Sequence, residues 1–515
     1  MKASFDWGLL AGAPQGIEHL RRLVVQLAVE GRLVAGRPED SSVDHLLALL
    51  QVARDAHYST SGQRPTKQVG EPDSGPFDLP SHWRWASLGQ LAHPQAGFAF
   101  KSSGFNETGD GLPLIRIRDV GQRFSCTYYS GEYRDEFLVS RGDYLISMDG
   151  EFRVSEWTHD EALLNQRVTR LQFFEGSVNR RYIAMSLQCR LRELQGVKTY
   201  TTVDHLSGGQ IATALIGVPP LEEQHRIVAK VDELIALCDR LEARQQDAEA
   251  AHARLVQALL DSLTQARNAD EFHACWQRLE GQFSDLATTD ASLDALRATV
   301  LELAFQGRLT ADGRNEPWQR VKLGSVAKLI NGDRGSNYPN RSEYVSEGIA
   351  FINTGHINPD GSLDLDAMHY LPREKFESLR SGKIEPDDLV YCLRGATLGK
   401  TAFVRPFTEG AIASSLVILR FAKVVLPEFA YYFLVSPQGR RWIWKYDNGS
   451  AQPNLAASSV REYEMPLPSL DEQRQVVSRV TELLALCDQL KARIAAARAK
   501  HAQLAEALVS QAVAA

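Results

Sequence analysis

The sequence of 515 residues contains no long apolar segment and no cluster of cysteines. Its longest apolar runs, such as residues 46–50 and 483–486, are far shorter than the roughly 20 residues that cross a bilayer. The six cysteines are scattered and form no Cys-x-x-Cys pair, whereas disulfide frameworks and zinc sites need closely spaced ligands. We therefore expect a cytoplasmic protein of about three or four domains, without a signal peptide, a metal site or a membrane contact.

The catalytic motifs of DNA-modifying enzymes and ATPases are also missing. The single Pro-Pro pair, residues 219–220, stands at a predicted helix start, and no Gly-x-Gly-x-x-Gly turn occurs. An adenine methyltransferase needs both a proline-containing loop for the flipped base and a glycine-rich cofactor turn. No lysine has an acidic residue two positions before it, as nucleases of the common restriction fold require. Residues 394–401 approach a P-loop, but Arg394 replaces its first glycine. The chain is therefore not expected to be an enzyme.

The chain has no excess of positive charge, since its net charge is −7. The acidity is concentrated in residues 219–317, which carry ten basic and eighteen acidic side chains. Residues 83–218 are near neutral, and residues 318–467 are slightly basic. Because the distribution of charge matters more than its sum, the two flanking segments remain free to approach phosphate.

What the sequence does contain is an internal repeat. Residues 219–259, which begin Pro-Pro-Leu-Glu-Glu-Gln, recur as residues 468–508, which begin Pro-Ser-Leu-Asp-Glu-Gln, and about half of the positions are identical. A second block, residues 20–33, recurs as residues 296–309. Each copy of this block predicts a short amphipathic helix that ends at a glycine. The predicted order of elements is therefore a short helix, a domain and a long helix, and this order occurs twice.

Two segments between these helices predict β-rich domains. Residues 88–218 and 323–466 contain short apolar runs separated by Gly, Asn, Asp and Ser turns, which is typical of strands. The two segments share little sequence beyond Gly-Asp-Tyr-Leu at 142–145, which matches Asp-Asp-Leu-Val at 387–390. We expect similar scaffolds with different surfaces.

One segment is not repeated. Residues 34–82 stand where the second copy has only residues 310–317. We expect a helix over residues 43–57 and an exposed linker over residues 58–81, which are rich in Ser, Gly, Pro and Gln.

Each long repeated helix carries an apolar seam at alternating steps of three and four residues. This heptad spacing predicts coiled coils over about 221–263 and 470–512. The seam is expected to continue at Leu255, Leu259 and Leu504. The seam residues with which we expect other helices and partner subunits to pack are Ile227, Val231, Leu234, Cys238, Leu241, Val476, Val480, Leu483, Cys487 and Leu490.

The length of these helices predicts that they act as spacers. A helix of about 43 residues is about 65 Å long, roughly two turns of B-DNA. We expect the first long helix to fold back through a linker at 267–290 onto the helix 291–306, and the terminal helix to pair with the helix 15–31. The prediction is an α+β molecule with an internal tandem repeat and pseudo-two-fold symmetry. In it, two long antiparallel coiled-coil regions separate two mostly β domains.

These motifs resemble those of the specificity subunits of type I restriction–modification systems. The resemblance lies in the two long-helix starts at 219–224 and 468–473, in the paired short helices that end in Gly-Arg-Leu, and in Arg-Gly-Ala-Thr-Leu-Gly-Lys at 394–400. Residues 449–455 resemble the family's exit from a target-recognition domain, and residues 207–211 approximate it in the first domain. The resemblance covers almost the whole chain in the expected order.

The resemblance implies a non-catalytic subunit that binds double-stranded DNA. Each β-rich domain would read one half of a split, asymmetric sequence, and the helical regions would dock two modification subunits. The chain itself would hold no cofactor. S-adenosylmethionine would bind the modification subunits, and ATP and magnesium would serve two restriction subunits. The expected boundaries are an N-terminal helix and linker at 1–82, target-recognition domains at 83–218 and 318–467, and helical spacers at 219–317 and 468–515.

Basic, amide and hydroxyl side chains of the β-rich domains are the candidates for DNA contact. Arg and Lys bind phosphates and guanine edges, and Asn, Gln and Ser bind base edges. The candidates are Arg116 and Arg118 in the first domain and Arg394, Lys400, Arg440, Arg441, Lys445, Asn448, Ser450 and Gln452 in the second. For each of them a turn cap, a surface ion pair or a packed helix edge remains an alternative.

The alternative to a DNA-binding subunit is a coiled-coil adaptor with two β domains that bind other ligands. The near-neutral β-rich domains keep this alternative open. Steeply salt-dependent binding to duplex DNA separates the two interpretations, because counterions are released only where phosphates are neutralised.

Overall fold

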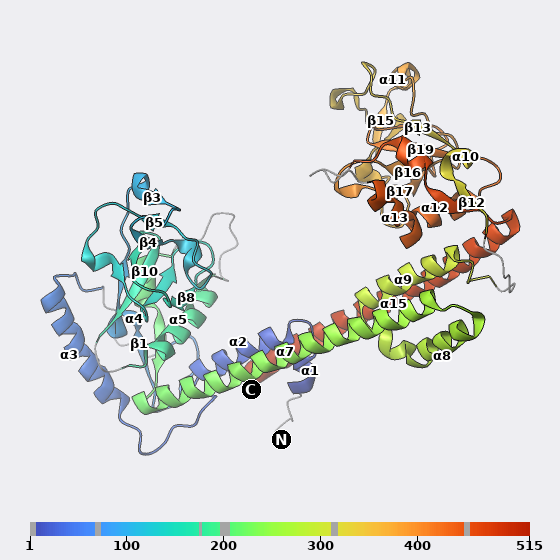
Figure 1. Ribbon diagram of the computed structural model, residues 1–515. Helices are drawn as coiled ribbons and strands as arrows, with labels where there is room; N and C mark the ends of the chain where they lie inside the picture. The colour runs from blue at the N-terminus through green and yellow to red at the C-terminus, as the bar shows by residue number, and fades with distance from the viewer. Residues whose placement is uncertain are drawn as a thin grey trace. The chain divides into compact units, whose positions relative to one another are not determined.

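The computed structural model describes residues 7–66, 74–174, 178–195, 206–310, 318–446 and 454–514. The chain folds into two compact units, Met1–Gln246 with Arg498–Ala515, and Asp247–Ala497. Two helices of 45 residues, α7 (Leu221–Gln265) and α15 (Leu470–Ala514), contribute to both units (Figure 1). Within the described ranges, no helix is long and apolar enough to span a membrane.

The first unit contains a β-rich domain, which we call the first head. A four-stranded antiparallel sheet has the order β2-β10-β7-β8, and a five-stranded sheet has the order β3-β5-β4-β9-β6, in which β4 and β9 are parallel. The strands are β1 (Arg84–Ser87), β2 (Ala92–Ala96), β3 (Phe105–Asn106), β4 (Leu112–Ile115), β5 (Tyr128–Tyr129), β6 (Leu138–Val139), β7 (Tyr144–Ser147), β8 (Val154–Glu156), β9 (Ala162–Leu164), β10 (Val168–Phe173) and β11 (Leu215–Val218). Strand β1 pairs with β11, so the head begins and ends side by side, next to the start of α7.

Helices join the first head to α7 through one apolar core. Leu46 and Leu50, Tyr182, and Ile227 and Val231 are buried in this core and come from α3, α5 and α7 respectively. The helices of this unit besides α7 and α15 are α1 (Trp7–Ala11), α2 (Gly16–Val29), α3 (Val43–Ser61), α4 (Leu88–Leu91), α5 (Arg180–Gln195) and α6 (Gly208–Thr213). Because α2 and α7 bury apolar side chains in the same core as the head, they form one packed body with it.

A separate cluster holds the end of α15 against the N-terminal helices. Leu10, Ile17 and Leu20 of α1 and α2 are buried together with Cys238 of α7 and Ala505 of α15. In Figure 1, α2 lies along α7, with α1 beside it. The expected pairing of the terminal helix with the helix at 15–31 is therefore confirmed at this end of α15.

The second unit repeats this scaffold in a second head. Its sheets have the orders β13-β19-β16-β17, β15-β14-β18 and β12-β20, and β14 and β18 are parallel. The strands are β12 (Arg320–Lys322), β13 (Ala327–Asn331), β14 (Ile349–Ile352), β15 (His369–Leu371), β16 (Leu389–Cys392), β17 (Thr401–Phe403), β18 (Gly410–Ile412), β19 (Leu416–Phe421) and β20 (Glu464–Pro466). Strands β12 and β20 pair, so this head also begins and ends side by side, next to α15.

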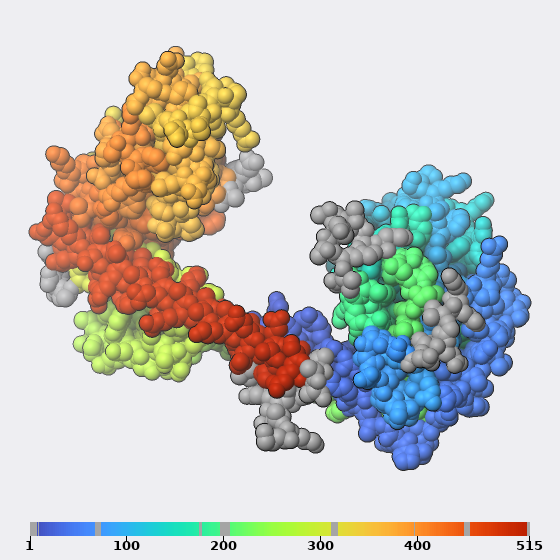
Figure 2. Space-filling model, turned by 180° about the vertical axis from the view of Figure 1, so that it is seen from behind, coloured from blue at the N-terminus to red at the C-terminus, as the bar shows by residue number. Residues whose placement is uncertain are grey.

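Helix α9 and the second head pack against the start of α15. Val300 and Phe305 of α9 share the core of the second head with Val476 and Val480 of α15. Figure 2 shows this head packed against the red α15. The helices here are α8 (Ala269–Leu286), α9 (Asp290–Phe305), α10 (Leu323–Val326), α11 (Arg373–Ser378), α12 (Pro427–Val435), α13 (Pro437–Tyr446) and α14 (Ala457–Arg461).

Two expectations about the helices are wrong. The expected linker at 267–290 is largely the helix α8, whose first turn is capped by the Asn268 side chain. The expected seam positions Leu255 and Leu504 are 49% and 52% exposed. In α7, Val256 is buried instead, because α8 and α9 pack against that face of the helix. The end of α7 does fold back onto α9, as expected, through contacts with Leu296.

Candidate nucleic-acid interface and its attachment to the long helices

A tight turn follows the equivalent parallel strand in each head. In the first head, Arg116 follows β4, and its backbone N–H donates to Asp119 Oδ2 at 2.7 Å. Asp119 is buried and also accepts from the N–H of Ser125 at 2.7 Å. Arg118 is exposed on this turn, and its guanidinium lies 3.3 Å from Thr127 Oγ1. The structure therefore places both predicted arginines on one firmly held turn at the end of the sheet.

In the second head the same turn carries different side chains. Asn353 follows β14, and its Oδ1 accepts from the N–H of Gly355 at 2.7 Å. Its amide nitrogen lies 3.3 Å from His356 Nε2 and 3.2 Å from His369 Nδ1. Burial lowers the pKa of His356, and the neighbouring His369 lowers it further. Where the first head presents Arg116, the second presents Asn353 bound to a pair of histidines.

A second pair of equivalent loops follows β7 and β16. In the first head β7 pairs with β10, with Ser147 opposite Val168. In the second head β16 pairs with β19 in the same way, with Cys392 opposite Leu416. The loop after β16 contains Arg394, which is exposed. It also contains Gly395 and Gly399, at φ 77° and 80°, a backbone region that glycine adopts readily. Lys400 Nζ lies 3.4 Å from the carbonyl oxygen of Ile357, so this predicted contact residue also braces the loop.

The equivalent loop of the first head was not identified from the sequence. Its residues Asp149 and Gly150 occupy the positions of Arg394 and Gly395, and Gly150 has φ 71°. Asp149 forms an ion pair with Arg167 at 3.4 Å. The match between 142–145 and 387–390, extended by five residues, gives this alignment, so the signal was present in the sequence.

Helix α13 carries three of the predicted basic residues. Arg440 is exposed, whereas Arg441 forms an ion pair with Glu302 of α9 at 2.6 Å. Lys445 Nζ lies 4.4 Å from the centre of the Trp442 ring. All three residues are exposed, and Arg441 in addition links the second head to α9. The predicted contact residues Asn448, Ser450 and Gln452 lie outside the described residues.

A buried glutamine attaches the first head to the start of α7. Gln224 accepts a hydrogen bond at 2.8 Å from the backbone N–H of Asn179, just before α5. It donates to the carbonyl oxygen of Pro219 at 2.9 Å. Gln224 is fully buried, so these bonds replace water at both ends of its amide.

The second repeat uses the same device. Gln473 accepts from the backbone N–H of Leu426 at 2.8 Å, just before α12, and donates to the carbonyl oxygens of Val424 and Pro468. Gln473 is also fully buried. The last residue of the shared Leu-x-Glu-Gln sequence therefore joins a head to its long helix in both copies.

The glutamate before each glutamine binds the tryptophan that opens the head. Glu223 accepts from Trp83 Nε1 at 3.2 Å and lies 2.8 Å from His82 Nε2. Glu472 accepts from Trp318 Nε1 at 3.4 Å and from the Ser469 hydroxyl at 2.8 Å. The start of the head and the start of the long helix are thus bonded to each other in each repeat.

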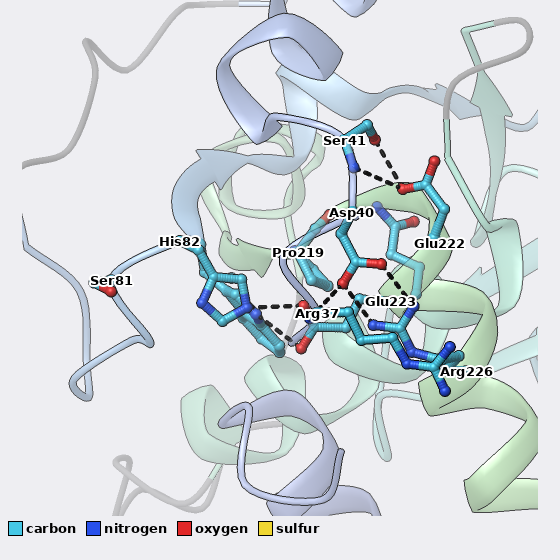
Figure 3. Close-up of polar contacts among 12 residues, drawn as sticks. Arg37, Asp40, Ser41, Ser81, His82, Pro219, Glu222, Glu223 and Arg226 are labelled. Atoms are coloured by element: carbon cyan, nitrogen blue, oxygen red, sulfur yellow. Dashed lines mark hydrogen bonds and ion pairs between the residues drawn. The ribbon is translucent and has the colours of Figure 1, made fainter. Parts of the chain in front are cut away.

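A further set of contacts occurs at the first junction and involves the unrepeated segment. We call residues 34–82 the strap, of which 34–66 and 74–82 are described. Figure 3 shows Asp40 and Ser41 of the strap facing Glu222 and Arg226 of α7. The Arg226 guanidinium beside Asp40 holds the pKa of that carboxyl below its usual range. Sequence reasoning assigned no role to these residues, because ion pairs between segments 186 positions apart leave no local pattern.

The described residues contain no group of three or more His, Cys, Asp or Glu side chains placed to hold a metal ion. The predicted contact residues that the structure describes are basic side chains on loops and on one helix of two similar scaffolds, some exposed and some partly buried.

Comparison with known proteins assigns the whole arrangement to one class. The family model "Type I restriction modification DNA specificity domain" matches residues 80–250 and 315–497, so it matches once in each repeat. The type I restriction enzyme EcoBI specificity subunit of Escherichia coli is 29% identical over 442 residues, which cover 85% of this chain and 87% of that protein. The EcoAI specificity subunit of Escherichia coli is 25% identical and covers 97% of this chain and 94% of its own length. The crystal structure of the HsdS subunit from Thermoanaerobacter tengcongensis covers 85% of this chain and 98% of its own, at 20% identity and a TM-score of 0.38.

Proposed function

The chain belongs to the type I restriction–modification DNA specificity family, and we propose that its two heads read the two halves of one split DNA target. As a specificity subunit it selects the DNA sequence and does not itself catalyse methyl transfer or cleavage. DNA and the other subunits of a type I complex are its partners. The family match decides against the alternative of an adaptor that binds no DNA.

The observation that carries the proposal is one scaffold with two different sets of loops. Both heads have a turn after the parallel strand and a glycine-containing loop after the strand at the centre of the four-stranded sheet. At these equivalent places the first head has Arg116 and Asp149, and the second has Asn353 and Arg394. Arginine binds guanine or phosphate, whereas asparagine suits adenine and a carboxylate accepts from cytosine. Two heads with different side chains at the same positions read an asymmetric target.

We also propose DNA contact for the other predicted residues of the two heads. Arg118 and Lys400 flank these loops, and Arg440 and Lys445 extend the exposed basic surface of the second head. Arg441 contributes less to DNA contact than they do, since its guanidinium is engaged by Glu302. We place the target-recognition domains at 83–218 and 318–467, with spacers at 219–317 and 468–515 and the N-terminal helix and linker at 1–82.

The helical regions dock two modification subunits in this proposal. Exposed leucines occur at equivalent positions of the two long helices. Leu237 and Leu486 are 44% and 48% exposed, and Leu255 and Leu504 are 49% and 52% exposed. The same apolar side chain exposed twice, in two copies of one helix, suits two copies of one partner. S-adenosylmethionine binds the modification subunits, and two restriction subunits supply the chemistry that uses ATP and magnesium.

Exchange of the first head tests the proposal. Residues 83–218 are replaced by the corresponding head of a relative, and the chain is purified with its modification subunits. Because β1 and β11 bring both ends of the head together beside α7, the exchange leaves the long helices intact. We expect methylation at a split site in which one half changes and the other half stays the same. Sequencing of methylated DNA measures this, and a change in both halves would contradict separate reading by the heads.

A further inference from the structure

The strap gives the two heads different attachments to their long helices. Both junctions contain the buried glutamine and the glutamate–tryptophan bond. Only the first repeat has 49 residues between the short helix block and the head, where the second has the eight residues 310–317. The difference between the repeats therefore lies in what the strap adds.

On one side the strap is bonded to the first turns of α7. Arg226 donates to both carboxylate oxygens of Asp40, at 2.7 and 2.6 Å, and the Asp40 side chain is 4% exposed. The backbone N–H of Arg37 donates to the same carboxylate at 2.8 Å. Ser41 donates its hydroxyl to Glu222 at 2.8 Å. A two-pronged arginine–carboxylate pair fixes orientation as well as distance.

On its other side the strap is bonded to the body of the first head. Val43, Leu46 and Leu50 of α3 are buried in the core of the head. The Tyr58 hydroxyl lies 3.1 Å from His93 Nδ1 on β2, and Gln63 donates to Gln172 on β10 at 3.2 Å. Because one segment is bonded to both the helix and the sheet, the head cannot rotate at the junction without breaking the contacts at one end of the strap.

The second repeat lacks the side chains that would receive a strap. At the positions of Glu222 and Arg226 it has Asp471 and Gln475. Asp471 pairs with Arg474 of its own helix at 2.6 Å, and Gln475 is exposed. The glutamate before the glutamine is also bound differently: Ser469 stands where the first repeat has Pro220 and bonds Glu472 locally.

We propose that the strap sets the angle of the first head on α7, with Asp40 and Arg226 as its positioning residues. This inference rests on the proposed reading of a split target by two heads. A head that is held at one angle meets its half-site at one distance from the other half-site. The strap therefore narrows the range of spacer lengths that the complex accepts, without contacting any base itself.

The test is the Arg226→Gln variant of the full chain, assembled with its modification subunits. Methylation is measured on DNA with the natural spacer and with one base pair added or removed. We expect methylation of the altered spacers relative to the natural one to rise about fivefold, the factor that corresponds to loss of roughly 1 kcal/mol. Discrimination against base changes within either half-site stays at the wild-type level. The matched variant Gln475→Ala, at the equivalent exposed position, keeps the wild-type spacer preference.

Further variants keep the test decisive. Arg226→Lys, which retains the charge but not the two-pronged geometry, is expected to fall between the wild type and Arg226→Gln. If Arg226→Gln does not fold, Ser41→Ala removes a single strap bond and must show the same relaxation in weaker form. A folded variant with weaker methylation but unchanged spacer preference would overturn the strap's positioning role. A wild-type complex that ignores spacer length altogether would instead overturn the proposed function.

Discussion

At the scale of single residues, two buried glutamines of a short repeated motif join each head to its long helix. Gln224 and Gln473 each bond the backbone just before a helix of the head and the proline that precedes the long helix. Helix starts have backbone N–H groups without partners in the helix. The glutamine supplies an acceptor from a different element, so the head and the long helix satisfy each other's polar groups.

Loss of either glutamine side chain is expected to weaken the molecule measurably. Gln224→Ala removes the acceptor of the partly buried N–H of Asn179, which costs about 1–3 kcal/mol of unfolding free energy. Gln473→Ala is expected to have a similar effect through Leu426. Urea unfolding of the purified chain measures both, and Gln246→Ala, at an exposed position of α7, serves as the control. Losses below about 0.5 kcal/mol, the usual range for surface changes, would show that these bonds do not hold the junction.

The residues of the candidate interface were only partly predictable. Arg116, Arg118 and Arg394 were proposed from the sequence because basic residues beside strand ends and glycine turns are a local pattern. The ion pair of Arg441 with Glu302 could not be found, since the partner lies 139 positions away. Asp149 was missed because it is acidic, although the alignment of the heads places it opposite Arg394. Equivalent loops are recognised from the pairing of the strands beside them, and this pairing is kept although the sequences of the heads have diverged.

At the scale of elements, the heptad pattern predicted where the long helices lie, but it did not predict what their outer faces contact. The bounds of α7 and α15 agree with the expected 221–263 and 470–512 to within two residues. Leu255 and Leu504 match the heptad spacing but are exposed. A heptad pattern marks apolar residues at regular spacing, and it does not distinguish contacts within the chain from contacts with another subunit. The helix α8 was missed because its apolar residues do not extend the repeat.

The exposed leucines predict how many modification subunits bind. Leu237→Arg places a charge in one of two equivalent docking surfaces, so the complex is expected to retain a single modification subunit. The double variant Leu237→Arg with Leu486→Arg is expected to retain none. Native mass spectrometry of the reconstituted complexes counts the subunits. Val52→Arg, at an exposed apolar residue of α3, is the control, and two bound subunits in the double variant would contradict docking at these leucines.

At the scale of the whole molecule, two copies of one design let a single chain carry out what symmetric DNA-binding dimers do with two chains. The heads share the strand order of the four-stranded sheet and the points of entry and exit, while the other sheet and the loops differ. The long helices share sequence far more closely than the heads do. This contrast fits the proposed division of tasks, in which the helices keep one geometry and one kind of partner and the heads change what is read. The repeat made this organisation predictable from sequence, whereas the strap, which occurs once, gave no such signal.

We expect the length of the long helices to determine the length of the spacer between the two half-sites of the DNA target. In the first unit Cys238 of α7 and Ala505 of α15 share a cluster, and in the second unit Leu263 and Leu483 line a common cavity, so both helices must lengthen together. Seven residues inserted after Ala243 and seven after Ala492 keep the heptads in phase and add about 10 Å to each helix. Both insertion points lie at exposed positions of the helices.

This double insertion is expected to lengthen the spacer by up to about three base pairs, at 3.4 Å each, and to leave both half-sites unchanged. Inserting two residues at each place turns the apolar faces by about 200° and is expected to abolish DNA binding. Sequencing of methylated DNA from cells that express each variant with its modification subunits measures the spacer. A folded and active seven-residue variant that keeps the original spacer would show that the helices dock partners without setting the distance between half-sites.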